Sequence, residues 1–150
     1  MKTLQKFGFY LLVLTIIVSC SKNNDETSSA TNCANECSHT IANGETASTV
    51  PSSLDGSYEL TYHAAQTGSP YTNGTKASFT LSNNTLTIDV DGKCITLKNP
   101  FRNSGGVQDI FTDDCDKNAQ YHISTLTDGS FNEMNVFGTD GTWLGQFAKL

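Results

Sequence analysis

The stretch TLTIDVDGKCITLK, residues 85–98, alternates apolar and polar side chains on both sides of a central Asp91-Gly92 pair. Alternation with a period of two is typical of a β-strand that buries one of its faces. An Asp-Gly pair accepts the positive φ angles of a two-residue hairpin turn, so residues 85–90 and 93–98 are expected to pair as antiparallel strands. This hairpin indicates the fold class, because the same pattern recurs through the rest of the chain.

Segments with similar alternation follow one another from residue 54 onward. They are SYELTYH (57–63), ASFTLS (77–82), QDIFT (108–112), QYHISTL (120–126), FNEMNVF (131–137) and TWLGQFA (142–148). Asp128-Gly129 and Asp140-Gly141 supply turns between the last three segments. The sequence shows no convincing amphipathic helix. We therefore predict an all-β domain over residues 54–150, a small antiparallel meander of about eight short strands that forms a barrel or a sandwich.

The N-terminal part of the chain has the layout of a secretory signal peptide. Lys2 and Lys6 precede an apolar run over residues 7–18, which at about a dozen residues is too short to span roughly 30 Å of hydrocarbon as a helix. The run ends in Ile-Val-Ser (17–19) directly before Cys20, and this resembles the lipobox of bacterial lipoproteins. The resemblance implies that residues 1–19 are removed and that Cys20 carries acyl chains such as palmitate. The alternative is cleavage elsewhere, with Cys20 free or in a disulfide.

Residues 20–32 are expected to form a flexible tether behind the lipid. The segment SKNNDETSSATN (21–32) has no large apolar side chain, so it buries too little surface to offset chain entropy. Lys22 followed by Asp25 and Glu26 resembles the signal that sends Bacteroidota lipoproteins to the cell surface, although two asparagines separate the lysine from the acids. The resemblance implies a lipid-anchored outer-membrane protein exposed at the surface. A periplasm-facing protein is the alternative, with the same residues acting only as a solvated linker.

The charge balance argues against two classes of polyanionic partner. Removal of residues 1–19 takes away two of the nine basic side chains and none of the 15 acidic ones, so the formal net charge changes from −6 to −8. An acidic protein of this kind has no electrostatic attraction for nucleic acid or for anionic lipid head groups. About a hundred residues remain past the tether, which is enough for one domain with one modest core.

Four cysteines remain once Cys20 is assigned to lipid. An even number in a small exported domain is typical of disulfides, so we expect two bonds among Cys33, Cys37, Cys94 and Cys115. One pairing joins Cys94 to Cys115 and Cys33 to Cys37. In the crossed alternative, both cysteines of the leading segment (residues 33–53) reach into the β domain and tie that segment down. A zinc site of Cys33, Cys37 and His39 with a further thiol is the competing interpretation.

The β domain also carries a second resemblance. The phrases YELTY, SPYTNG, NPF, FNEMNV and LGQF occur in this order between residues 58 and 147. In this the chain is similar to a group of small bacterial β proteins to which no activity is attached. The resemblance implies one coherent domain from residue 54 to the C-terminal end, and it supplies no catalytic residue.

The acidic loop 109–118 holds the densest cluster of potential ligands. Asp114, Asp116 and Asn118 stand at alternate positions, as at the start of a calcium loop. The pattern departs after that, because Ala119 occupies the place of the turn glycine and Thr125 that of the bidentate glutamate. These three residues are therefore weak metal candidates beside the simpler interpretation of a solvated loop.

Loop aromatics are the other candidates for binding. Most aromatic residues of the β domain are expected in the core, but Tyr71 in GSPYTNG and Phe101 in NPFRNSGG stand in turn-rich segments where a ring is more often exposed. Together with Arg102 and Asn103 they form a candidate site for stacking on a sugar ring or for filling a partner's pocket.

These patterns predict a protein that binds and does not catalyse. No G-x-S-x-G or GxxxxGK[ST] motif occurs, and alternation places His63 and His122 on exposed strand faces. We expect a lipid-anchored outer-membrane protein that acts as a non-enzymatic binding or structural module of the envelope. It would have no cofactor, and its partners would be the membrane and a glycan, a protein or a small ligand. The alternative is a metal-dependent enzyme or cation-binding protein that uses loop 109–118 with His63 or His122.

Overall fold

The computed structural model describes residues 33–149. The expected signal peptide, the lipidation site Cys20 and the tether lie outside the described residues. Within residues 33–149, no helix is long and apolar enough to cross a membrane.

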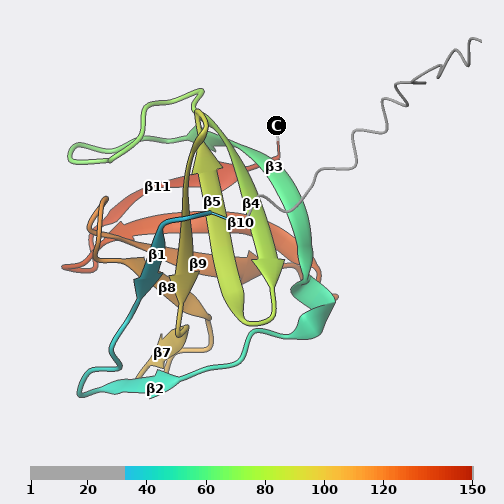
Figure 1. Ribbon diagram of the computed structural model, residues 1–150, viewed down its shortest axis with the longest axis vertical. Coiled ribbons are helices and arrows are strands. Elements are labelled where there is room, and N and C mark those ends of the chain that lie inside the picture. Colours follow the sequence, from blue (N-terminus) through green and yellow to red (C-terminus); the bar gives the residue numbers. More distant parts are fainter. Residues whose placement is uncertain (1–32, 150) are drawn as a thin grey trace, which may run out of the picture.

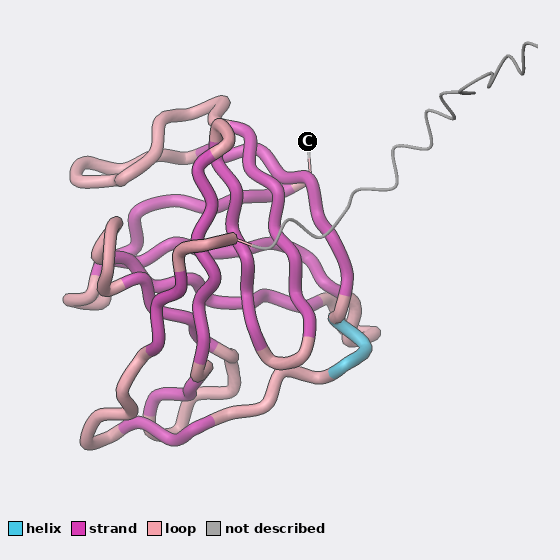
Figure 2. The backbone as a smooth tube through the Cα atoms, viewed as in Figure 1, coloured by secondary structure: helices cyan, strands magenta, loops and turns pink. Residues whose placement is uncertain are grey.

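The protein folds as a single curled sheet of 11 strands that forms a half-barrel, which confirms the all-β prediction (Figure 1). Its only helical element among the described residues is the short 3₁₀ turn Ser52–Leu54 (Figure 2). The strands are β1 (Glu36–Ser38), β2 (Glu45–Ala47), β3 (Gly56–His63), β4 (Lys76–Ser82), β5 (Thr85–Val90), β6 (Lys93–Lys98), β7 (Phe101–Asn103), β8 (Ile110–Asp113), β9 (Ala119–Thr125), β10 (Phe131–Gly138) and β11 (Trp143–Ala148).

The strands form two meanders that meet in the middle of the sheet. Their order is β1-β6-β5-β4-β3-β11-β10-β9-β8-β7-β2, so the first long strand β3 pairs with the last strand β11. The hairpin of residues 85–98 is confirmed, since Val90 pairs with Lys93 and both Asp91 (φ 53°) and Gly92 (φ 74°) have positive φ. Eight of the strands match the predicted segments, and β1, β2 and β7 are additional.

The core lies on the inner face of the curled sheet. Side chains at alternate positions of the long strands point inward and are fully buried, as the period of two requires. The largest are Tyr62, Phe79, Leu81, Leu86, Leu97, Phe111, Tyr121, Met134, Val136 and Phe147.

The leading segment reaches both edges of the sheet. Its strand β1 pairs in parallel with β6 at one edge, and β2 pairs antiparallel with β7 at the other. Figure 1 shows this stretch running from β1 at the front of the sheet down to β2 at the bottom of the view. The segment therefore links two edges that the curl of the sheet brings near each other.

Two disulfides hold the leading segment in the crossed arrangement. Cys33 is bonded to Cys94 on β6, and Cys37 of β1 is bonded to Cys115 in the loop between β8 and β9. All four cysteines are therefore paired as predicted, and the pairing of Cys94 with Cys115 is wrong. The zinc interpretation is also wrong, because the sulfur atoms of Cys33 and Cys37 are bonded to other sulfur atoms.

His39 connects strand β2 of the leading segment with the loop between β8 and β9. Its Nε2 lies 2.8 Å from Glu45 Oε2 and its Nδ1 lies 3.2 Å from Asp114 Oδ2. Its ring stacks on Phe101 at 4.5 Å between centroids. Burial is the largest influence and by itself would lower the pKa of His39, but the hydrogen bonds and charges of Glu45 and Asp114 together raise it above its usual value. Protonated His39 therefore stabilises this junction.

We expect the junction to make stability depend on pH. A histidine whose pKa is raised by folding stabilises fully below its unfolded pKa of about 6.5, and this contribution is lost as the pH rises through the raised value. The pKa of Glu45 is lowered despite its burial, by hydrogen bonds from Ala42 and His39, so the Glu45 contribution stays constant above its unfolded pKa. Urea denaturation gives the free energy of unfolding at pH 6 and at pH 8. We expect it to decrease between these pH values in the wild-type protein, and to decrease by on the order of 0.5–1 kcal/mol less in His39→Gln. Equal losses in the two proteins would contradict the assignment.

Candidate functional site

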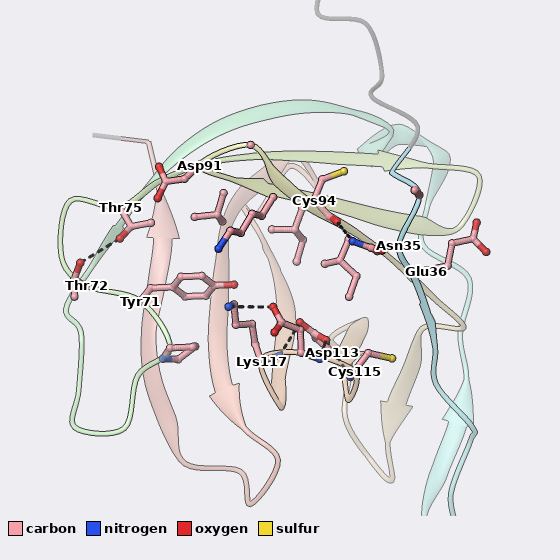
Figure 3. A pocket seen from close by; sticks show the side chains of 18 residues that line it. Asn35, Glu36, Tyr71, Thr72, Thr75, Asp91, Cys94, Asp113, Cys115 and Lys117 are labelled. Atoms are coloured by element: carbon pink, nitrogen blue, oxygen red, sulfur yellow. Dashed lines mark hydrogen bonds and ion pairs between the residues drawn. The ribbon is translucent and has the colours of Figure 1, made fainter.

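An open pocket of about 1110 Å³ lies where four segments converge (Figure 3). The segments are the turn between β5 and β6, the loop 64–75 between β3 and β4, the loop 114–118 between β8 and β9, and the start of the leading segment. We call this space the mouth pocket. Its lining residues are Ala34, Asn35, Glu36, Pro70, Tyr71, Thr72, Thr75, Ile88, Val90, Asp91, Gly92, Lys93, Cys94, Ile95, Asp113, Cys115, Asp116 and Lys117.

The mouth pocket combines an apolar floor with a charged rim. Ile88 and Val90 of β5 and Ile95 of β6 supply aliphatic surface, because the alternation of both strands turns these side chains inward. At the rim, Lys117 pairs with Asp116 at 3.0 Å, whereas Lys93 forms no ion pair with any residue of the described chain. The pocket therefore offers apolar contact below and a free ammonium group at its edge.

Both disulfides contribute to the walls of the pocket. Cys94 and Cys115 line it directly, and their partners Cys33 and Cys37 belong to the leading segment that forms one side. Asn35 Nδ2 also donates a hydrogen bond to the carbonyl oxygen of Cys94 at 3.4 Å. These bonds fix the wall formed by residues 33–37 to β6 and to the loop between β8 and β9.

Tyr71 lies at the pocket, but its expected exposure is wrong. Its side chain is only 8% exposed, and its ring packs against Tyr62 and Phe147. Its hydroxyl group lies 2.6 Å from the hydroxyl group of Tyr121 in a buried hydrogen bond. Burial raises the pKa of Tyr71 to about 12, so it stays protonated. The loop folds back over the core, and Tyr71 forms part of the pocket floor instead of an exposed stacking surface.

The other residues of the expected binding group lie elsewhere. Phe101 is fully buried beneath His39, Arg102 Nε binds Asp109 Oδ1 at 2.7 Å, and Asn103 pairs with Glu45 in the ladder of β2 and β7. These three residues form the strand β7 and not a loop, because the chain beyond Pro100 pairs with β8 and β2. The structure therefore does not bring them together with Tyr71.

The acidic loop is organised by its own hydrogen bonds. The fully buried carboxylate of Asp113 accepts the backbone N–H groups of Cys115, Asp116 and Lys117, which explains why an acid is tolerated there. Asp114 turns to His39, and Asp116 turns to Lys117. Among residues 33–149, no group of three or more His, Cys, Asp or Glu side chains is arranged to hold a metal ion.

The three weak metal candidates therefore do not converge, and neither do the histidines of the enzymatic alternative. Asp114 and Asp116 turn to different partners, and Asn118 occupies a tight turn with φ 51°. His63 lies on β3 near Gln146, and His122 lies on β9 near Gln120. Neither histidine lines the mouth pocket with Asp113 or Asp116. A shared acid–base or metal site is not assembled from these groups.

Sequence reasoning missed most of the pocket. Alternation predicted that Ile88 and Val90 share one face of their strand, but it carried no information on which residues of that face line a pocket. The position of Glu36 and Asn35 follows from the disulfide pairing, which spacing alone left open. Comparisons with protein-family models, curated proteins and solved structures find no match to this chain. Its function is therefore inferred from the geometry.

Proposed function

We propose that the mature chain is a lipid-anchored outer-membrane protein whose β domain is a non-enzymatic binding module for a small, partly apolar ligand. The observation that carries the binding role is the mouth pocket, where the half-buried side chains of Val90 and Ile95 lie beside Lys93, which has no ion-pair partner within residues 33–149. Apolar pockets with a few polar groups at the edge are the usual form of small-molecule sites. The lipobox-like sequence before Cys20 supports the anchor.

The ligand chemistry follows from the floor and the rim. A short apolar chain or ring would cover Val90 and Ile95, and an anionic group would reach Lys93. Burial of apolar surface contributes about 25 cal/mol per Å², so a small amphiphile can bind here without any covalent step. Octanoate is a suitable first probe, since it combines both features.

We expect octanoate to bind the full mature protein, and binding to be lost when the floor is charged. In Ile95→Glu a carboxylate replaces apolar floor and repels the probe, so the affinity should fall at least about tenfold, equivalent to about 1.4 kcal/mol. Isothermal titration calorimetry measures this loss. The matched control is Thr96→Glu, the next residue on β6, which points to the opposite face and contacts Thr87. This variant should keep its affinity within about twofold.

Two results would count against a binding role for the mouth pocket. One is the absence of octanoate binding to the wild-type protein. The other is an equal loss of affinity in Ile95→Glu and Thr96→Glu, since a general effect of added charge would then explain the result.

The anchor is tested separately by intact mass spectrometry of the protein purified from membranes. We expect a mature chain that begins at Cys20 and carries two or three acyl chains, because two chains hold a protein on a membrane far more firmly than one. Cys20→Ala should lose this mass and appear in the soluble fraction. Protease treatment of whole cells then separates surface exposure from a periplasm-facing location. An unlipidated wild-type protein would refute the anchor.

A further inference from the structure

We propose that the outer face of β3, β11, β10 and β9 is a binding site for a neutral oligosaccharide, distinct from the mouth pocket. This face is defined by the side chains of these four strands that point away from the core. Its members include His63, Gln146, Glu133, Asn135, Trp143, Phe137 and His122.

The register of the sheet places these side chains in one row. His63 pairs with Gln146, Gln146 pairs with Asn135, and Asn135 pairs with His122 across three neighbouring strand pairs. The residues next to them along each strand, such as Tyr62 and Phe147, are buried in the core, so the row points to the other side. Figure 1 shows β9, β10 and β11 running side by side. Neighbouring strands lie about 4.8 Å apart, so the row is about 14 Å long, a length suited to a short oligosaccharide.

A hydrogen-bond network fixes the polar groups of the row. Gln146 Nε2 donates to Glu133 Oε2 at 2.9 Å, and Asn135 Nδ2 lies 3.3 Å from Glu133 Oε1. Trp143 Nε1 donates to Asn135 Oδ1 at 3.3 Å, and Gln146 Nε2 lies 3.3 Å from His63 Nε2. Side chains held in this way lose little conformational freedom when they bind a ligand.

The network leaves bonding capacity for a ligand. Within residues 33–149, Gln146 Oε1 has no hydrogen-bond partner, and Asn135 Nδ2 uses one of its two hydrogens. A planar amide offers a donor and an acceptor side by side, as adjacent sugar hydroxyl groups do. The row therefore matches a ligand that both donates and accepts hydrogen bonds.

Aromatic rings flank the amides. Trp143 and Phe137 pair across β11 and β10, and the ring of His122 lies 4.3 Å from that of Phe137. All three are half-buried, which leaves part of each ring accessible. The face of an aromatic ring is apolar and electron-rich, so it packs well against the C–H groups on one face of a sugar ring.

The charge of the row favours a neutral ligand. Among the side chains named above, the only carboxylate is that of Glu133, and none is a lysine or an arginine. Two amide N–H groups already approach that carboxylate. Burial lowers the pKa of His122 to about 4, so its ring is uncharged at neutral pH. A polyanion finds no cation here, whereas an uncharged polyhydroxyl chain meets donors, acceptors and rings.

The chain contains a single tryptophan, Trp143, which makes its fluorescence a direct reporter of this face. The full mature protein is titrated with four uncharged probes: cellohexaose, xylohexaose, mannohexaose and maltohexaose. We expect a saturable change in the emission of Trp143 with at least one of them. No saturable change with any of the four would overturn the proposal.

Variants separate this face from the mouth pocket. Gln146→Ala should weaken the binding at least tenfold. If Gln146→Ala fails to fold, the nearly isosteric Asn135→Asp serves instead; it removes the free amide hydrogen of Asn135 together with the one that is bonded to Glu133. Ile95→Glu, in the mouth pocket, should leave the affinity within about twofold. A fluorescence change that survives both outer-face variants, or that disappears in Ile95→Glu, would refute the assignment. If octanoate fails to bind but an oligosaccharide binds, the proposed function of the mouth pocket is refuted and the proposal for the outer face stands.

Discussion

Replacing Cys37 and Cys115 together by serine is expected to lower the free energy of unfolding by about 3–4 kcal/mol. The disulfide joins residues 78 positions apart, and a cross-link that closes a long loop removes much of the entropy of the unfolded chain. A loss of this size in a domain of about a hundred residues lowers the melting temperature by on the order of 10–20 °C. Differential scanning calorimetry and urea denaturation measure the two quantities.

The same variant should also open the mouth pocket. Cys37 belongs to β1, whereas Cys115 belongs to the loop between β8 and β9 and lines the pocket, so the bond holds this part of the pocket wall against β1. We expect octanoate to bind the double serine variant more weakly than the wild-type protein, under conditions in which both are folded. The weaker binding would show that the bond shapes the site in addition to stabilising the chain.

The other disulfide supplies the matched control. Cys33 and Cys94 are 61 positions apart, so chain entropy predicts a similar loss of stability when both become serine. Their bond joins the leading segment to β6, with which β1 already pairs at Glu36, Cys37 and Ser38. Octanoate affinity should therefore fall less in this variant. Equal affinities in the two variants, or a melting temperature unchanged by the loss of Cys37–Cys115, would contradict the argument.

Local pattern was sufficient for the long strands and insufficient for the short ones. The hairpin of residues 85–98 has alternation and an Asp-Gly turn, and both signals agree with the structure. The strands ECS (β1), ETA (β2) and FRN (β7) are only three residues long, too short for a period of two to indicate them. They are strands only because the open edges of the half-barrel offer them hydrogen-bond partners.

For the candidate sites too, the sequence indicated which side of a strand a residue faces but not which residues it meets. Alternation placed His63 and His122 away from the core correctly, and both lie on the outer face. It could not show that Gln146 and Asn135 lie between them, because the pairing of β3 with β11 joins the two ends of the domain. Tyr71 was misjudged for the same reason, since its burial depends on the partner Tyr121, fifty positions away. The neighbours of the two histidines and the burial of Tyr71 both depend on which distant strands and loops meet, and a single sequence does not reveal this.

Substituting alanine for Gly145 is expected to lower the free energy of unfolding by about 4 kcal/mol. Gly145 has φ 136°, a conformation that side chains with a β-carbon rarely adopt. A β-carbon there would lie 2.5 Å from Tyr62 Oη and 3.1 Å from the carbonyl oxygen of His63. Tyr62 would have to move, although its hydroxyl group donates to the carbonyl oxygen of Leu144 at 2.7 Å inside the core. Backbone strain and a broken buried hydrogen bond therefore add together.

Gly141→Ala separates these two causes. Gly141 also has positive φ, 82°, but a β-carbon there meets nothing within 4 Å. Only the backbone strain remains, so this variant should lose about 1 kcal/mol. Urea denaturation gives the free energy of unfolding of each variant. The difference between the two losses measures the cost of the contact between residue 145 and Tyr62. If Gly145→Ala loses no more stability than Gly141→Ala, Tyr62 is free to move, and the close approach of β3 and β11 does not constrain the backbone at Gly145.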